Sequence, residues 1–327
     1  MKKNRLVFFN GHFVPEHQAK VSIYDSALMF GDMVFEMTRS FNKKQFLLEA
    51  HIDRLLIGLK ILRIDLKYSK KQIIDFCHKT VEINKKYMAD DDEDRLMIDV
   101  SRGILGIYEN VTGIHKGPNL IIANFPLRWT VQGMGKLFDE GINGVVTPQR
   151  AIPSKYMDPK IKNRSRLFYL NANIEASQFK GKNNWAVLLD SDGNIAEGSG
   201  DNIFIVKDKK IITPKGKDIL RGISRNYVLN KLCKELNLEA YEENIDPYDV
   251  YSADEMFMTG TPFCMLPVTH FNGLKIGSGK RGEVFNKLLS QWSKNTNTDI
   301  EKQIKLWNKK DKKDKKKLLS PYEFKKK

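Results

Sequence analysis

Asp158-Pro-Lys-Ile-Lys-Asn-Arg-Ser-Arg166 precedes a helix-like run that ends at Ile174-Glu-Ala176. The chain continues through Trp185-Ala-Val-Leu-Leu-Asp190 to Ala196-Glu-Gly-Ser-Gly-Asp-Asn202. A lysine therefore stands at the end of an extended segment. About thirty-five residues later, Glu197 follows a second predicted strand and leads into a glycine-rich turn. An amine and a carboxylate of this kind can hold a ring that carries an aldehyde and a basic nitrogen.

Length and composition indicate a soluble chain of two domains. The 327 residues are enough for two cores, and hydrophobic residues make up 41% of them. No apolar run approaches the ~20 residues that span a bilayer, and the N-terminus lacks a signal-peptide core. We therefore expect a cytoplasmic protein without membrane contacts. Three distant cysteines and six scattered histidines show no metal or disulfide spacing, so buried free thiols are expected at Cys77 and Cys233.

The net charge of +15 raises the alternative of a non-catalytic protein that binds nucleic acid. Residues 308–327 contain ten lysines and three acids, a net +7, so nearly half of the excess lies in the last twenty residues. The other basic residues are interleaved with acids, which favours a solvated surface. Salt-sensitive nucleic-acid binding that is lost on deletion of 308–327 would support the alternative. We expect no nucleic-acid partner.

The first part of the chain has clear local signals. Asn10-Gly11 between two apolar runs predicts a β-hairpin with a type I′ turn. Apolar residues at helical spacing predict a helix from Ile52 to Leu62, and a second is predicted over 70–87. Strands are expected at 96–100 and 119–124, and the acidic run 90–94 is expected to be a solvated loop. Three further motifs are Gly31-Asp-Met-Val-Phe-Glu36, His51-Ile-Asp-Arg-Leu55 and Ser101-Arg-Gly103.

The second part contains the remaining motifs. Two lysines, Lys160 and Lys162, compete for the role of nucleophile, and Lys162 stands closer to the predicted strand-to-helix junction. Asp192-Gly193 predicts a hairpin turn between two strands. Gly222-Ile-Ser-Arg225 opens a predicted helix, with Ser224 as its expected N-cap, and free amides there suit a phosphate. A predicted strand ends at Thr259-Gly-Thr261, and Pro262 follows without a backbone N–H.

Together these motifs, from about Phe9 to about Gly279, resemble the fold-type IV pyridoxal phosphate enzymes. That family includes branched-chain aminotransferases, D-amino acid aminotransferases, (R)-amine transaminases and aminodeoxychorismate lyases. The resemblance implies an α+β fold, with a smaller N-terminal α/β domain and a larger C-terminal domain of mixed sheet or barrel and helices. We expect the small domain over 1–125, an interdomain loop over 126–135, the cofactor domain over 136–295, and a basic tail or added helix over 296–327.

The resemblance also implies roles for residues of the first domain, with pyridoxal 5′-phosphate as the cofactor. Arg54 matches the arginine that holds the cofactor phosphate, and its planar fork suits phosphate oxygens. Phe35 matches an aromatic position of the substrate pocket, although Met33 replaces the usual second glycine. Arg102 matches an arginine-glycine loop that approaches the substrate carboxylate, and a structural role at the strand end is the equal alternative.

In the second domain the resemblance selects Lys162 as the catalytic lysine that carries the cofactor. Glu197 matches the acid on the pyridine nitrogen. Ile223, Ser224 and Thr261 match the phosphate-binding residues, and Thr261 is also expected to contact substrate. One departure concerns the tyrosine that, in the branched-chain branch, bonds the phenolic oxygen of the cofactor five residues after the lysine, because Leu167 occupies that position here.

The activity implied by the resemblance is transfer of an amino group between an amino acid and a 2-oxo acid such as 2-oxoglutarate. Phe35 and the Arg102 loop favour a branched-chain L-amino acid as donor. Leu167 argues against that donor, and the D-amino acid branch also has an apolar residue in this region. The segment Asp158-Pro-Lys-Ile-Lys-Asn163 resembles (R)-amine transaminases. A lyase that keeps the same cofactor residues is a further alternative. Family members assemble as dimers, so a homodimer or larger homo-oligomer is expected.

Overall fold

The computed structural model describes residues 4–313, which form two compact units. The first unit contains the chain up to Leu127 together with the segment Ile161–Arg166, and the second contains Arg128–Lys160 and the chain from Leu167 onward. The sequence-based division had placed 161–166 within the second domain. The chain therefore returns to the first unit for six residues, and these include Lys162.

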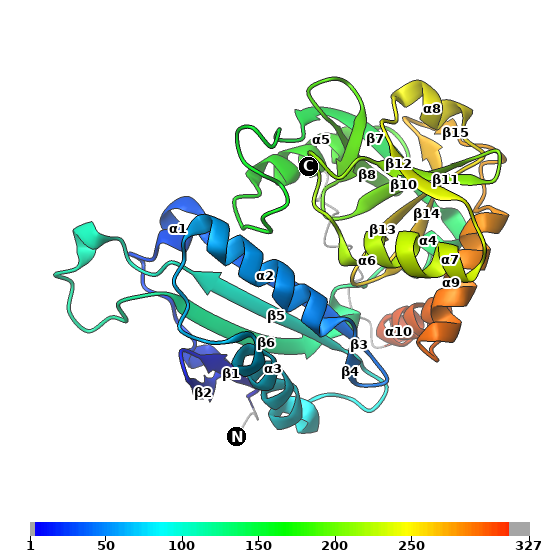
Figure 1. The fold of residues 1–327 in the computed structure, drawn as a ribbon. Helices are drawn as coiled ribbons and strands as arrows, with labels where there is room; N and C mark the ends of the chain where they lie inside the picture. Colours follow the sequence, from blue (N-terminus) through cyan, green and yellow to red (C-terminus); the bar gives the residue numbers. More distant parts are fainter. Residues whose placement is uncertain (1–3, 314–327) are drawn as a thin grey trace. The chain divides into compact units, whose positions relative to one another are not determined.

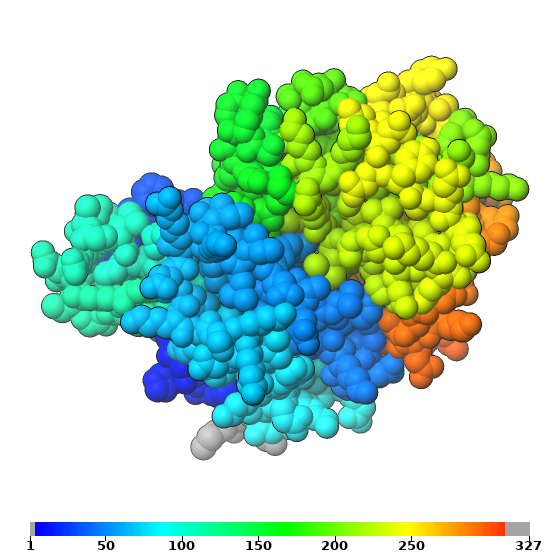
Figure 2. Space-filling view, in the orientation of Figure 1, coloured from blue at the N-terminus to red at the C-terminus, as the bar shows by residue number. Residues whose placement is uncertain are grey.

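The first unit is built on a six-stranded antiparallel sheet with the order β2-β1-β6-β5-β3-β4. Its strands are β1 Leu6–Phe9, β2 His12–Pro15, β3 Met33–Phe41, β4 Lys44–Gln45, β5 Asp94–Ser101 and β6 Asn119–Pro126. The predicted hairpin is confirmed, because Asn10 and Gly11 both have positive φ, as a type I′ turn requires. The long loop between β5 and β6, coloured turquoise, projects from the body of this unit (Figures 1 and 2).

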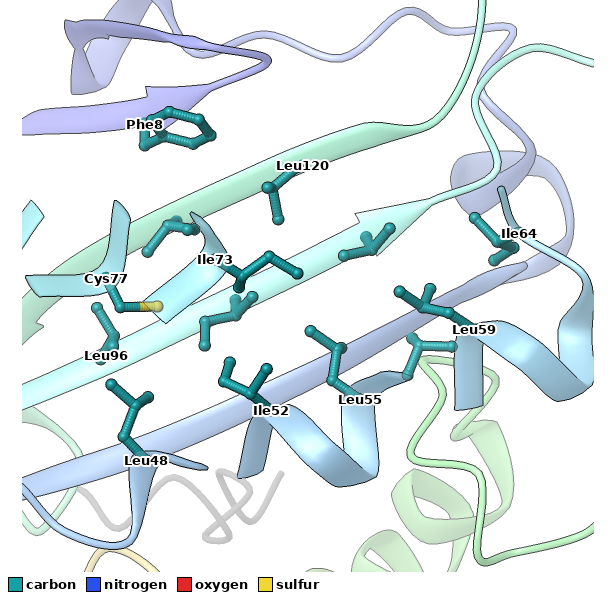
Figure 3. Close-up of a cluster of buried hydrophobic side chains, with 14 of the residues drawn as sticks. Phe8, Leu48, Ile52, Leu55, Leu59, Ile64, Ile73, Cys77, Leu96 and Leu120 are labelled. Atoms are coloured by element: carbon teal, nitrogen blue, oxygen red, sulfur yellow. The ribbon is translucent and has the colours of Figure 1, made fainter. Parts of the chain in front are cut away.

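Two helices, α2 Leu48–Leu62 and α3 Lys70–Asn84, cover one face of this sheet (Figure 1). The predicted apolar face of α2 is confirmed, since Ile52, Leu55 and Leu59 point toward the strands and are almost fully buried (Figure 3). Strand residues that point to the helices alternate with residues on the opposite face. Val34 belongs to the helix-facing core, and its neighbour Phe35 therefore lies on the other face. A short helix, α1 Ser26–Phe30, precedes β3.

The prediction of a solvated acidic loop at 90–94 was wrong for its second half. Asp92, Glu93 and Asp94 are buried. The Glu93 carboxylate accepts hydrogen bonds from the backbone amides of Asn42 (2.8 Å) and Lys43 (3.0 Å) in the β3–β4 turn. Glu93 therefore pairs with backbone donors and holds the β3–β4 turn in place, although the acidic run is typical of a solvated surface in the sequence.

The second unit contains a nine-stranded mixed sheet. Its strands are β7 Ile142–Arg150, β8 Asn184–Leu189, β9 Ile195–Gly198, β10 Asn202–Lys207, β11 Lys210–Pro214, β12 Ala240–Glu243, β13 Glu255–Gly260, β14 Cys264–Phe271 and β15 Leu274–Lys275. Strands β10, β13, β14, β7, β8 and β9 pair in that order, and β9 pairs back to β10, so the sheet closes into a barrel. Closure falls at Asn202, which pairs with both Glu197 and Thr259.

Helices complete the second unit. They are α4 Leu137–Glu140, α5 Leu167–Gln178, α6 Ile223–Tyr227, α7 Cys233–Glu235, α8 Pro247–Ser252, α9 Glu283–Asn295 and α10 Ile300–Lys313. A π-helical turn at Val228–Leu232 joins α6 to α7. Helix α5 packs on β7 and β8 through small residues such as Ala172 and Ala176. The added helix expected after residue 296 is present as α10, and the rest of the predicted basic tail lies outside the described residues.

Two observations concern sequence features of the whole described chain. Cys77, Cys233 and Cys264 are free and buried, which confirms the expectation for the first two. Within residues 4–313, no helix is long and apolar enough to cross a membrane, and no group of His, Cys, Asp and Glu side chains is arranged to hold a metal ion.

Candidate active site

Lys162 lies in a short irregular segment that pairs with β3. The backbone amide of Phe35 donates to the carbonyl oxygen of Lys162 (2.9 Å), and Asn163 forms a β-bridge with Val34. Ile161 anchors the segment in the core of the first unit. The lysine is therefore fixed by backbone pairing to β3.

The Lys162 amine lies 4.8 Å from the centroid of the Phe35 ring and makes no hydrogen bond or ion pair with the described residues. Part of the residue remains exposed, but its amine is enclosed. Burial lowers the pKa of Lys162 well below its ordinary value, and the positive charges of Arg166, Arg54 and Arg95 lower it further against the opposing charge of Glu36. A lowered pKa increases the neutral fraction of the amine, which is its nucleophilic form.

Arg54 on α2 is held by a buried carboxylate on β3. Its Nε donates to Glu36 Oε1 (2.6 Å), and a terminal nitrogen donates to Glu36 Oε2 (2.9 Å). His51, one helical turn earlier, shares Glu36 Oε2 through Nδ1 at 2.7 Å. Burial alone would raise the pKa of Glu36, but Arg54 and His51 hold that pKa far below its usual range. Burial lowers the pKa of His51 despite Glu36, so the imidazole is neutral near pH 7.

Arg102 is engaged in contacts that hold the end of the sheet. Its guanidinium forms two hydrogen bonds with Asp32 (2.5 and 3.2 Å) and donates to the carbonyl oxygens of Leu62 and Arg63 at the end of α2. Cations at a helix C-terminus are favoured by the free carbonyls there. These contacts support the structural alternative for Arg102.

The two competing lysines have different surroundings. The Lys160 amine is paired with Asp158 (2.8 Å) and donates to the carbonyl oxygen of Lys217 (3.0 Å), whereas the Lys162 amine has no such partner among the described residues. Lys160 also belongs to the second unit. The geometry therefore favours Lys162, in agreement with the motif.

In the second unit, Glu197 lies in β9 at the closure of the barrel and is buried. Its Oε2 accepts from the backbone amide of Leu220 (3.0 Å), and its Oε1 accepts from the hydroxyl of Tyr169. Tyr169 lies in the first turn of α5 and is itself buried. Leu167, the residue at the expected tyrosine position, is 67% exposed. A buried tyrosine is therefore present two residues later than the motif spacing indicated.

The turn after Glu197 and the start of α6 approach each other through glycines. A Cβ on Gly198 would lie 2.1 Å from Asp201 Oδ1, and a Cβ on Gly222 would lie 2.1 Å from Asn202 Oδ1. The side-chain amide of Asn202 donates to the carbonyl oxygen of Leu220 (2.9 Å), so it fixes the segment that leads into α6. The space freed at Gly198 is used by Asp201, a neighbour within the same turn.

Helix α6 begins with Ile223, and its N-cap is Gly222, which has no side-chain cap. The expectation that Ser224 is the N-cap was wrong, because Ser224 is the second helical residue. Its amide and that of Ile223 belong to the first turn, where backbone N–H groups have no intrahelical acceptor. Arg225 fastens this turn to β11 by donating to Pro214 O (2.7 Å), and it pairs with Glu242 (2.8 Å).

Thr261 follows β13 in a turn and is partly exposed. Two residues earlier, the Thr259 hydroxyl is buried and has no hydrogen-bond partner among the described residues, and the same is true of the Ser199 hydroxyl in the turn after Glu197. Buried polar atoms are seldom left unpaired in a native state. Unpaired hydroxyls beside Glu197 and Thr261 in the sequence fit a segment that receives a polar ligand.

Each unit by itself carries part of the predicted constellation. The first unit has an enclosed, unpaired amine and a clamped arginine, and the second has a buried acid and a helix start. The chain belongs to the class IV aminotransferases, since the model of that family, described as "Amino-transferase class IV", matches residues 33–271.

Known proteins of this family resemble the chain over nearly its whole length. A putative branched-chain-amino-acid aminotransferase of Methanocaldococcus jannaschii is 36% identical over 86% of this chain and 93% of its own. A probable branched-chain-amino-acid aminotransferase of Aquifex aeolicus is 31% identical over 86% and 89%. The crystal structure of the Escherichia coli branched-chain amino acid aminotransferase superposes with a TM-score of 0.78 at 28% identity, covering 89% and 94%. These comparisons confirm the predicted family and its two-domain α+β fold.

Sequence reasoning missed Tyr169, Glu36 and His51 as members of the site. Glu36 and His51 both belong to the quoted motifs. The signal for Glu36 was a carboxylate in one motif that could pair with the always-charged Arg54 of the next motif. The signal for Tyr169 was its position two residues beyond Leu167, on the same predicted helix. A fixed spacing from the lysine concealed it, because the loop Asn163–Arg166 sets where α5 begins.

The low pKa of Lys162 predicts its behaviour in a titration of the cofactor-free protein. Reductive methylation with ¹³C label followed by NMR should show the Lys162 signal changing at a lower pH than the signals of other lysines. Lys70 is the matched control, because its hydrogen bond with Asp53 raises the pKa of that amine. The signals are assigned with Lys162→Arg and Lys70→Arg. A Lys162 signal that titrates together with that of Lys70 would contradict the lowered pKa of Lys162.

Proposed function

We propose that this class IV aminotransferase uses pyridoxal 5′-phosphate to move the amino group of a branched-chain L-amino acid to a 2-oxo acid such as 2-oxoglutarate. The similarity to proteins described as branched-chain aminotransferases supports the substrate class. One solved branched-chain amino acid aminotransferase is described in complex with N-(5'-phosphopyridoxyl)-L-glutamate, and it superposes with a TM-score of 0.78 at 25% identity, covering 93% of this chain and 98% of that one. The observation in this chain that carries the proposal is the enclosed, unpaired amine of Lys162.

The proposed roles follow from the contacts of each residue. Lys162 would hold the cofactor through its aldehyde, and the amine, once freed, would carry the proton from the substrate α-carbon to the cofactor carbon. Bound pyridoxal phosphate supplies an electron sink for the α-carbon. Glu197 would face the ring nitrogen and keep it protonated, while the hydroxyl of Tyr169 and the amide of Leu220 orient its carboxylate.

The cofactor phosphate is assigned to Arg54, the amides of Ile223 and Ser224, and Thr261. Arg54 contributes a fixed charge, because Glu36 holds it in one orientation. The start of α6 contributes backbone N–H groups, which favour phosphate. Phe35 is assigned to the floor beneath the Lys162 amine, and substrate contact by Thr261 remains part of the proposal. For Arg102 we propose that it supports the end of the sheet.

A half-reaction tests the proposed activity. The protein is loaded with pyridoxal phosphate and mixed, without an acceptor, with L-leucine, D-alanine or an (R)-amine. We expect the visible absorbance of the bound cofactor to be lost with L-leucine and much more slowly with the other two. Lys162→Ala should abolish the reaction, while Lys160→Ala serves as the matched control and should retain it. Conversion of D-alanine or the amine in preference to L-leucine would move the chain to another branch of the family.

The clamp on Arg54 predicts an effect on cofactor affinity. Glu36→Gln removes the charge that fixes the guanidinium, so the Kd of the apoprotein for pyridoxal phosphate should rise by about tenfold, which corresponds to ~1.4 kcal/mol. The Kd for pyridoxal, which lacks the phosphate, should change far less. Glu49→Gln is the control, because Glu49 lies on the exposed side of α2, the helix that carries Arg54. Equal losses for both ligands would mean that Glu36 acts only on the fold.

We also propose that the chain forms a homodimer and, as the sequence indicated, that it works in the cytoplasm. Helix α5 presents Leu167, Leu170 and Ile174 at helical spacing with 67%, 44% and 39% of each exposed, and such a stripe is typical of an interface. The three free cysteines fit a reducing compartment. Sedimentation should give about twice the chain mass of 37.7 kDa, and Leu170→Asp with Ile174→Asp should shift it toward one chain. A wild-type protein that stays a monomer at all concentrations would contradict the dimer.

A further inference from the structure

Arg164, two residues after Lys162, contacts the same aromatic ring as the lysine. Asn163 between them forms the β-bridge to Val34, which ties this segment to β3. Phe35 is the common neighbour: its ring centroid is 4.8 Å from the Lys162 amine and 3.7 Å from the Arg164 guanidinium carbon.

Arg164 is held in place, yet most of its donors are open. One terminal nitrogen donates to Asp99 Oδ1 at 2.9 Å, and its plane rests over the Phe35 ring. Asp99 lies directly across from Phe35 in the β3–β5 register and is buried. Of the five N–H groups of a guanidinium, the described residues accept from one, and the side chain is 34% exposed. A fixed arginine with free donors is suited to a carboxylate from outside the chain.

We propose that Arg164 binds the distal carboxylate of a dicarboxylic substrate, and is therefore the residue that admits a 2-oxo diacid, or its amino acid, to the Lys162 site. The inference rests on the proposed function, because it names the residue that recognises one of the two substrates. Asp99 acts as a positioning residue that holds the guanidinium on Phe35.

The spacing assigns Arg164 to the distal carboxylate. The α-carboxylate is attached to the carbon that bonds the reacting nitrogen, so it must lie next to the Lys162 amine. The distal carboxylate of a five-carbon diacid lies a few bonds further away, and the Arg164 guanidinium, which lies over the same Phe35 ring as the amine, is placed to meet it. Arg166, whose guanidinium carbon is 5.6 Å from the same ring, adds positive charge beside this position.

The test compares two donors in the half-reaction of the cofactor-loaded protein. For R164M, the ratio of kcat/KM for L-glutamate to kcat/KM for L-leucine should fall by about 30-fold relative to wild type, as expected for the loss of a charge-assisted hydrogen bond. R164K keeps the charge without the planar fork, so its ratio should lie between the two. R5M is the matched control, because Arg5 also pairs with a carboxylate in the first unit, near β1, and its ratio should equal that of wild type.

A second readout does not require turnover. Glutarate and 4-methylpentanoate compete with the donor, and R164M should raise the inhibition constant of glutarate about 30-fold relative to that of 4-methylpentanoate. If R164M does not fold, judged by its thermal transition and cofactor content, both ratios are measured on R164K. An unchanged ratio, or an equal loss for both ligands, overturns the inference while leaving the proposed transaminase intact. Failure of the wild-type protein to convert any amino acid would instead contradict the proposed function.

Discussion

The pairing of Ile161–Arg166 with the edge of β3 is the constraint on which the first half of the site depends. It brings the Lys162 amine onto the Phe35 ring and places it near Arg54, Arg95 and Arg166. A charged ammonium is unfavourable away from water and beside these cations, so the pKa of the amine is lowered. The lowered pKa of the lysine is therefore a property of its surroundings, and the backbone pairing of Ile161–Arg166 places the lysine among them.

The two faces of β3 carry residues with different roles. Glu36 points to the helices and fixes Arg54, while Phe35 points the other way and carries Lys162 and Arg164. A shift of one residue in the β3–β5 register would exchange these faces and destroy both arrangements. The buried core of Val34, Ile98 and Ile122 opposes such a shift, so packing of the sheet and geometry of the site are maintained by the same contacts.

Local patterns predicted those parts of the fold that depend on local chemistry. The Asn10-Gly11 turn, the apolar face of α2 and the hairpin at Asp192-Gly193 follow from backbone preference and helical spacing, and all three are present. Arg54, Lys162 and Glu197 were found because motifs preserve the order of residues along a chain. Long-range partners were not predictable in this way. Glu93 looked solvated because its acceptor role depends on a turn fifty residues away, and Tyr169 was missed because loop length decides where α5 starts.

Closure of the barrel fixes the turn that holds Glu197. Asn202 pairs with Glu197 on one side and Thr259 on the other, so one residue joins β9, β10 and β13. Its side chain also binds Leu220 O, and Leu220 N binds Glu197. The carboxylate is thus oriented by the element that closes the sheet. Asp201 fills the space that Gly198 leaves, and its carboxylate accepts a hydrogen bond from the Trp185 indole at 2.8 Å. A side chain at position 198 would displace Asp201 from the turn that follows Glu197.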